Sequence, residues 1–170
     1  MDSKIEKIIP PKSTISRTEG IPINDMTKVV SYIEGKNIRL IGTKQLSDQL
    51  AASEHKPSLF ISSSATGYYG DRKDNELNEN SEPGTGFLPE VCVEWENSTK
   101  SAENAGIRTV HIRTGIVLSK EGGALKKMLP PFLFGAGGIL GDGKQFMSWI
   151  SIKDEINAIL FIINNQTITN

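Results

Sequence analysis

Residues 60–71, FISSSATGYYGD, decide the fold class of this chain. A short apolar run, residues 58–63, follows Pro57 and is bounded by turn formers, a pattern typical of a buried strand in a parallel sheet. Three serines close the run, and a hydroxyl buried without a partner costs free energy. A strand that ends in this way indicates hydroxyls that meet either neighbouring backbone or a ligand.

The segments around this strand predict alternating helices and strands. We expect helices at 25–34 (capped by Asn24 or Asp25), 37–53, 87–106 and 153–165, a short helix ended by Pro130 and Pro131, further strands at 107–119 and 145–152, and a long loop at 67–86. Such alternation favours an α/β fold with a parallel sheet. Residues 1–35 read as an irregular or diverged N-terminal arm, and residues 36–170 as one domain.

Composition restricts the function classes. The chain has 170 residues and a formal net charge of −1, which gives no overall attraction to nucleic acid or to an anionic membrane. Its longest apolar run, residues 156–163, is shorter than the roughly 18 residues that span a bilayer. One cysteine, Cys92, predicts a reducing, cytoplasmic compartment. His55 and His111 have no further ligands at suitable spacing, so we expect no metal site.

The motif S-S-S-A-T-x-Y-x-G after a strand resembles the extended short-chain dehydrogenase/reductase superfamily. A wider set of segments resembles its epimerase family proteins, the cell-division-inhibitor-like subfamily, over about residues 36–165. That set is SATGYYGD (64–71), FLPEVCVEWE (87–96), RTGIVL (113–118), GGALKKMLPPF (122–132), GAGGILGDGKQFMSWI (135–150) and Asp154. The resemblance implies a partial Rossmann-type parallel sheet with flanking helices, NADP or NAD as cofactor, and a small-molecule or nucleotide-sugar substrate.

The resemblance also implies roles for particular residues. Ser64 corresponds to the catalytic serine, and Tyr68 or Tyr69 is our candidate for proton transfer. The candidate cofactor contacts are Ser62, Ser63, Arg113, Thr114 and Gly115, and the candidate substrate contacts are Gly137, Gly138, Lys144 and Gln145. Each has a structural alternative: a strand end satisfied by backbone for the serines, packing under the long loop for the tyrosines, an ion pair for Arg113, and a simple turn for the glycines.

Two departures from the family pattern leave the activity open. No G-x-x-G-x-x-G turn, which holds a pyrophosphate at a helix N-terminus, occurs before residue 36, so the chain reads as truncated and lacks the glycine-rich dinucleotide-binding unit. The family's Tyr-x-x-x-Lys pair is also missing. Phe87 or Gly86 occupies the tyrosine position, and Pro89, Glu90 or Val91 the lysine position. The alternatives to an epimerase or reductase are therefore a non-catalytic binding module and an inactive fragment.

Overall fold

The structure, a computed structural model, describes residues 26–139 and 141–169, with side chains from residue 37 onward. The predicted N-terminal cap and residues 1–25 of the predicted arm lie outside the described residues, and the predicted boundary at residue 35 stays a prediction. In chain order, the elements are α1 (Met26–Ala52), β1 (Leu59–Ala65), the 3-10 helix η1 (Thr66–Tyr69), α2 (Phe87–Asn97), α3 (Lys100–Asn104), β2 (Arg108–Thr114), β3 (Ile116–Leu118), α4 (Gly123–Leu133), β4 (Trp149–Ser151) and α5 (Ile152–Asn164).

Strands β1 and β2 pair in parallel, as the sequence pattern predicts. Their register sets Leu59 opposite Arg108 and Ser64 opposite Arg113. Because side chains alternate along a strand, Phe60, Ser62 and Ser64 point to one face and are buried, whereas Ser63 is exposed. The three serines therefore do not act as one polar tip: two of them face the helices. The α/β fold class with a parallel sheet is confirmed.

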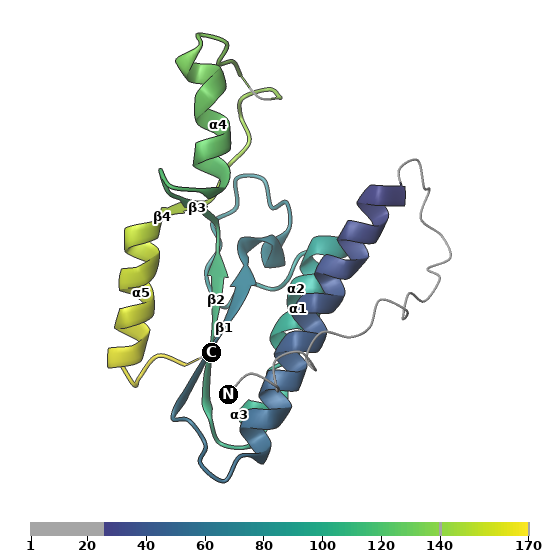
Figure 1. Cartoon of the computed structure of the whole chain (residues 1–170), viewed down its shortest axis with the longest axis vertical. Coiled ribbons are helices and arrows are strands. Elements are labelled where there is room, and N and C mark those ends of the chain that lie inside the picture. The colour runs from purple at the N-terminus through teal and green to yellow at the C-terminus, as the bar shows by residue number, and fades with distance from the viewer. Residues whose placement is uncertain (1–25, 140, 170) are drawn as a thin grey trace.

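Helices α1, α2 and α3 lie on one side of these strands, and α5 lies on the other (Figure 1). A small apolar core forms where Phe60, Ala102 and Ile107 meet, with Leu50 of α1 packed against them. Ser47, which is fully buried, joins α1 to α3: its Oγ donates to the Thr99 carbonyl at 3.0 Å and accepts from the Ala102 N–H at 2.9 Å.

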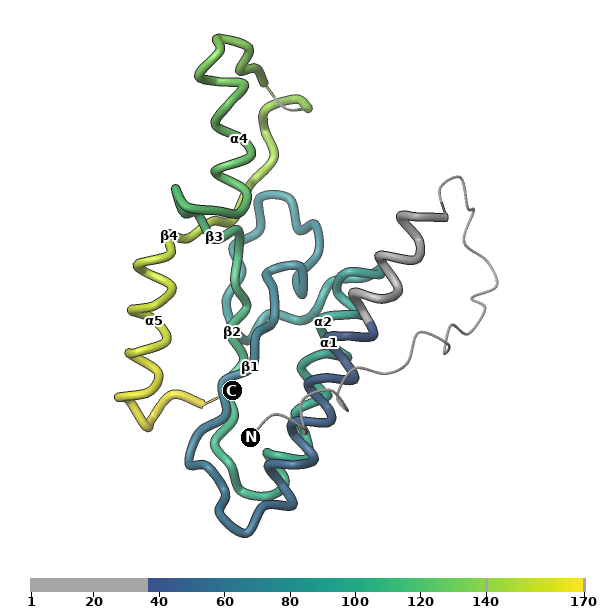
Figure 2. Tube along the Cα trace, viewed as in Figure 1, coloured from purple at the N-terminus to yellow at the C-terminus, as the bar shows by residue number. Residues whose placement is uncertain are grey.

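A second parallel pair, β3 with β4, extends the strand path beyond β2. Figure 2 shows the chain passing from β2 directly into β3. Gly115 makes this junction possible, because a Cβ at this position would lie 2.6 Å from the Ser148 carbonyl oxygen. The Ile116 N–H donates to that same oxygen at 2.8 Å. The loop that precedes β4 is thus held against the end of β2.

The predicted ends of several helices and strands were wrong. Helix α1 is continuous through Gly35, since a single glycine costs only about 1 kcal/mol in a helix. The predicted helix 87–106 is divided at Ser98 and Thr99, and the predicted strand 107–119 at Gly115. Pro130 and Pro131 lie inside α4, whose end is held by their carbonyls, which accept from Phe134 and Ala136. None of the helices in the described part of the chain is long and apolar enough to cross a membrane.

Candidate functional site

A cleft lies at the carboxyl end of β2, where ligands bind in open α/β sheets. Its volume is about 1670 Å³, and we call it the strand-end cleft. It is bordered by η1 and the long loop on one side, the start of α2 on another, and the segment that precedes β4. Five of the predicted site residues line it: Tyr69, Thr114, Gly115, Lys144 and Gln145.

The long loop that borders the cleft is closed at its base by Arg72. The guanidinium donates from Nε to the Tyr69 carbonyl at 3.0 Å, and from Nη2 to the carbonyls of Glu82 and Pro83 at 2.8 and 2.9 Å. Gly84 allows the two ends of the loop to touch, because a Cβ there would lie 2.4 Å from the Tyr69 carbonyl oxygen. These contacts fix η1, and with it Tyr69, against the cleft.

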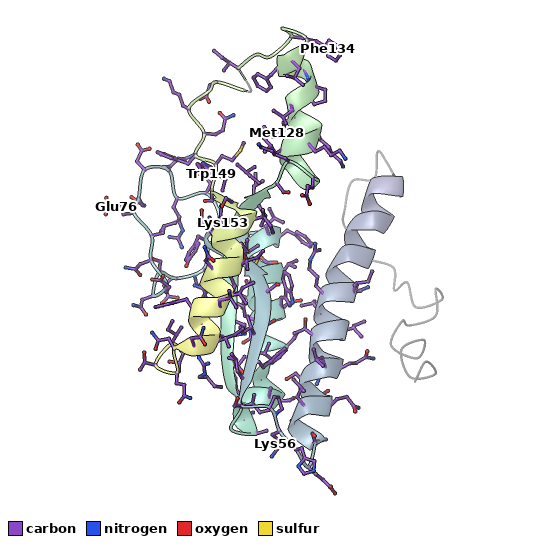
Figure 3. The ribbon with its side chains drawn as sticks, turned by 60° about the vertical axis from the view of Figure 1, so that its left-hand side comes forward. Lys56, Glu76, Met128, Phe134, Trp149 and Lys153 are labelled. Carbon is purple, nitrogen blue, oxygen red and sulfur yellow. The ribbon has the colours of Figure 1, made fainter. Side chains whose placement is uncertain are left out.

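The remaining predicted residues lie elsewhere. Ser62 and Ser64 are buried toward the helices, and Ser63 is exposed. Gly137 packs against the ring of Phe132 near the tip of α4, and neither Gly137 nor Gly138 lines the strand-end cleft. Figure 3 shows Phe134 at the far end of the same helix.

A buried polar cluster connects the two strands to α2 and η1; it consists of Ser64, Glu96, Arg113 and Tyr69. Ser64 Oγ donates to Glu96 Oε1 at 2.6 Å. Arg113 binds the same carboxylate in a bidentate manner, with both N···O distances at 2.9 Å. Its Nη1 donates to the Tyr69 hydroxyl at 3.0 Å. Charge-assisted pairs of this geometry are the strong ones in proteins.

The rings of Tyr68 and Tyr69 also contact the Arg113 guanidinium. Arg113 Cζ lies 3.5 Å from the centroid of the Tyr68 ring and 5.2 Å from that of Tyr69, distances suited to a cation–π contact. The two rings meet edge to face with an interplanar angle of 79°. Tyr68 therefore packs on Arg113 rather than lining the cleft, whereas Tyr69 does both.

The cluster shifts the pKa of its members. Burial alone would raise the pKa of Glu96, but the hydrogen bonds from Arg113 and Ser64 outweigh it and lower that pKa. The hydrogen bonds to Glu96 raise the pKa of Arg113. Nearby, burial lowers the pKa of His111 and raises that of the Cys92 thiol. At neutral pH the centre of the cluster is an ionised carboxylate held by a guanidinium.

Sequence reasoning missed Glu96. A signal was present, because Glu96 follows Cys92 by one helical turn and so lies on the inward face of α2 with Val91 and Cys92. A carboxylate on an apolar face needs a charged partner. It also missed the apolar wall of the cleft, which the start of α2 supplies through Phe87, Leu88 and Pro89.

A second cavity, of about 700 Å³, runs along the open edge of β2. Its lining includes Tyr69, Glu96, His111 and Arg113, so it meets the polar cluster from another side. Among the described residues, no three His, Cys, Asp or Glu side chains are grouped so that they could hold a metal ion.

Comparison with known proteins identifies relatives of this chain. It is 43% identical over 134 residues to an epimerase family protein of Mycobacterium leprae, a match that covers 79% of this chain and 43% of that protein. The chain spans 42–48% of the length of the curated relatives that it matches in this comparison. No family model matches the chain.

Solved structures agree with this relationship. The crystal structure of a nucleoside-diphosphate sugar epimerase from Corynebacterium glutamicum matches with a TM-score of 0.74 and 40% identity, over 82% of this chain and 30% of that one. The human epimerase family protein SDR39U1, solved with NADPH, matches with a TM-score of 0.77 and 27% identity, over 82% of this chain and 48% of that one. The resemblance predicted from the serine motif is confirmed.

Proposed function

We infer that the chain belongs with the epimerase family proteins that it resembles, of the short-chain dehydrogenase/reductase type, and we propose that its strand-end cleft is the substrate side of a nicotinamide-dependent site. The ligand of this side is a small molecule or a nucleotide-linked sugar. The observation that carries the proposal is the convergence of Tyr69, Thr114, Gly115, Lys144 and Gln145 at the carboxyl end of β2. The names of the relatives, one an epimerase of nucleoside-diphosphate sugars and one solved with NADPH, support it.

The described residues suit only one end of a dinucleotide. Thr114 and Gly115 line the cleft, and the Thr114 hydroxyl donates to Glu155 at 2.8 Å, but no G-x-x-G-x-x-G turn for a pyrophosphate occurs before residue 36. When bound, the nicotinamide supplies hydride transfer. This chain's residues would position the ligand: Lys144 by attracting a phosphate, and Gln145 by hydrogen bonding through its amide.

Proton transfer in this site falls to Tyr69 in our proposal. The positions of the family's Tyr-x-x-x-Lys pair are at the start of α2, where the cleft wall is apolar through Phe87, Leu88 and Pro89. Tyr69 lines the cleft, and its oxygen accepts from Arg113, which leaves its own proton for donation to a ligand. Ser64 stays the proposed catalytic serine, and Ser62, Ser63, Arg113, Gly137 and Gly138 stay proposed ligand contacts.

A second candidate is a non-catalytic binding module in a reducing, cytoplasmic compartment. The same apolar wall favours it, because a phenyl or leucyl side chain can contact a ligand but cannot exchange a proton with it. The cleft, Lys144 and Gln145 would then bind the ligand without turnover.

Thermal unfolding with and without ligands tests both. We expect the melting temperature to rise with NADPH or NADH, and also with UDP-glucose. A ligand present at about 100 times its dissociation constant increases the free energy of unfolding by roughly 2.7 kcal/mol. A rise in melting temperature with UDP-glucose, and none with NADPH or NADH, would favour the binding module. The variant Lys144→Ala should lose the UDP-glucose effect, whereas Lys153→Ala, an exposed lysine of α5 outside the cleft, should keep it. No shift with any of the three ligands would contradict the proposal.

A further inference from the structure

Two groups of apolar side chains border the strand-end cleft. One group, Phe87 and Leu88, lies at the start of α2, and the other, Phe146 and Met147, lies in the segment before β4. Their exposed fractions range from 37% for Phe87 to 79% for Phe146. Apolar side chains that line a cleft and remain this exposed are in a position to contact a ligand.

Contacts of the backbone place both groups near the carboxyl end of β2. A Cβ at Gly67 would lie 3.8 Å from Leu88 Cβ, so the start of α2 adjoins η1, the element that carries Tyr69. On the other side, the Ser148 carbonyl accepts from the Ile116 N–H at 2.8 Å. The two residues before Ser148 are thereby held close to the end of the strand.

Polar side chains at the same place are largely engaged within the chain. The Thr114 hydroxyl donates to Glu155 at 2.8 Å, and the Arg72 guanidinium donates to three backbone carbonyls. The Tyr69 hydroxyl accepts from Arg113 and keeps its own proton. A ligand at the end of β2 therefore meets a hydroxyl donor at Tyr69 and apolar side chains beside it.

We propose that the ligand group at the end of β2 is a flat, mainly apolar ring with a single carbonyl or hydroxyl, rather than a sugar ring. This inference rests on the proposed function, because it places the oxygen of that ring at Tyr69. A sugar ring has a hydroxyl on most of its carbons, and each hydroxyl that loses water without gaining a partner costs free energy. An aromatic ring avoids this cost and gains from contact with Leu88 and Phe146.

The charged side chains of the cleft are compatible with this choice. They come from residues 71–76 and 142–144, which are separate from the two apolar groups. Phosphates of a nucleotide would meet Lys144 there, whatever ring lies at the end of β2. We therefore expect UDP-glucose to bind through its UDP part, with little added by the glucose.

The first test is an NMR titration of the full chain with 1-tetralone, an aromatic cyclic ketone, and with glucose. 1-Tetralone should bind at least about tenfold more tightly, because it buries apolar surface that glucose lacks. Leu88→Ser and Phe146→Ser should each weaken its binding at least about fivefold, since each removes apolar contact area. Both residues are exposed, so these changes leave the core intact. Equal affinities for 1-tetralone and glucose would overturn the inference.

Leu133→Ser is the matched control. Leu133 is 79% exposed on α4 and does not line the cleft, so this change should leave the binding of 1-tetralone unaltered. If Leu133→Ser weakened binding as much as Leu88→Ser, 1-tetralone would be binding to exposed apolar surface in general. That result would also overturn the inference.

The second test compares UDP with UDP-glucose by thermal unfolding, and the two should raise the melting temperature equally. A dissociation constant at least about tenfold lower for UDP-glucose would show that the glucose has hydrogen-bond partners of its own. It would overturn the inference and leave the proposed function intact. The opposite failure is also distinguishable. If Leu88→Ser weakens 1-tetralone but NADPH, NADH and UDP-glucose cause no shift, the proposed function is contradicted and the ring preference of the cleft is supported.

Discussion

At the scale of single residues, Arg113 has the largest number of roles. From sequence it was a candidate cofactor contact, with an ion pair as the alternative. In the structure its carboxylate partner is Glu96 of the same chain, and its plane is covered by Tyr68. The guanidinium thus joins α2 to η1. It binds the Glu96 carboxylate, whose side chain is 11% exposed, and donates to the hydroxyl of Tyr69.

Removing this guanidinium should strongly destabilise the fold. Arg113→Ala leaves a buried, unpaired carboxylate, and breaking such pairs costs about 3–5 kcal/mol. Urea unfolding followed by circular dichroism measures the loss. Lys44→Ala is the matched control, because the Lys44–Asp48 pair is exposed and pairs of that kind contribute about 0–1 kcal/mol. Similar losses in the two variants would show that the Glu96 pair contributes no more than a surface one.

The stability of the chain should fall as pH decreases below about 6.5, the ordinary pKa of histidine. Burial lowers the pKa of His111 in the folded state, so the unfolded chain takes up a proton that the folded chain refuses. The contribution is present above pH 6.5 and is lost as pH falls through the folded pKa, with a slope of at most about 1.4 kcal/mol per pH unit.

Melting temperatures between pH 7.5 and 5 measure this effect. His111→Gln should flatten the profile over that range, whereas His55→Gln, on the segment between α1 and β1, should leave it unchanged. The lowered pKa of Glu96 affects stability in a separate pH range. The ionised carboxylate stabilises the folded state, and this contribution to stability is lost only as pH falls below about 4.5. An unchanged slope in His111→Gln would refute the assignment.

At the scale of elements, the contact between α1 and α3 depends on one hydroxyl. Ser47→Ala removes a donor to the Thr99 carbonyl and an acceptor for the Ala102 N–H, all three residues being fully buried. Leaving buried backbone groups unsatisfied costs about 1–3 kcal/mol. Chemical unfolding measures the change against Ser98→Ala, whose hydroxyl makes an exposed bond to the Glu94 carbonyl. Equal effects would contradict this role for Ser47.

Element types could be predicted from sequence because they follow from local patterns. The strand at residues 58–63 and the helix that begins near Asp154 follow from apolar runs with polar boundaries, and the parallel pairing of β1 with β2 follows from the alternation of helices with strands. Boundaries that depend on tertiary contacts could not be predicted. The break at Gly115 exists because Ser148 approaches it from 33 residues away along the chain, by the difference of the two residue numbers.

The candidate site shows the same difference between features that follow from local sequence patterns and features that depend on tertiary contacts. Five of its predicted residues line the cleft because they lie where a strand ends or where glycines form a loop. The orientation of Ser64 could not be predicted, since it depends on which face of β1 meets α2, and a shift of one residue reverses that face. Glu96 was missed for the same reason, because its partners come from two strands that are far from it in sequence.

At the scale of the whole molecule, buried residues concentrate in α2, α3, β1 and β2. Helices α4 and α5 contain no buried residue, and Phe132, Leu133, Phe134, Trp149 and Phe161 are all exposed. Helix α4 extends away from the strands (Figure 1). Large exposed apolar side chains such as the consecutive Phe132, Leu133 and Phe134 are typical of a region that meets other molecules or other parts of a protein.

Hydrogen–deuterium exchange should reproduce this division. We expect amides of β1 and β2 to exchange at least about tenfold more slowly than those of α4, because elements with few buried contacts open locally at low free energy. Mass spectrometry of peptic peptides from the intact chain resolves the two regions. Equal protection of α4 and β1 would mean that α4 is covered in solution by a contact that its exposed residues do not reveal.

The closure of the long loop by Arg72 fixes the two ends of the loop to each other. One guanidinium binds both ends of the loop, at Tyr69 and at Glu82 and Pro83. Between these ends, the Glu79 carbonyl accepts from Arg113 at 3.1 Å, and residues 71–77 line the cleft. Glu76 lies in that outer part, on the outside of the molecule (Figure 3). Lengthening a loop whose ends are already fixed adds little conformational cost. An insertion near Glu76 would therefore change the wall of the cleft while Arg72 keeps Tyr69 in place.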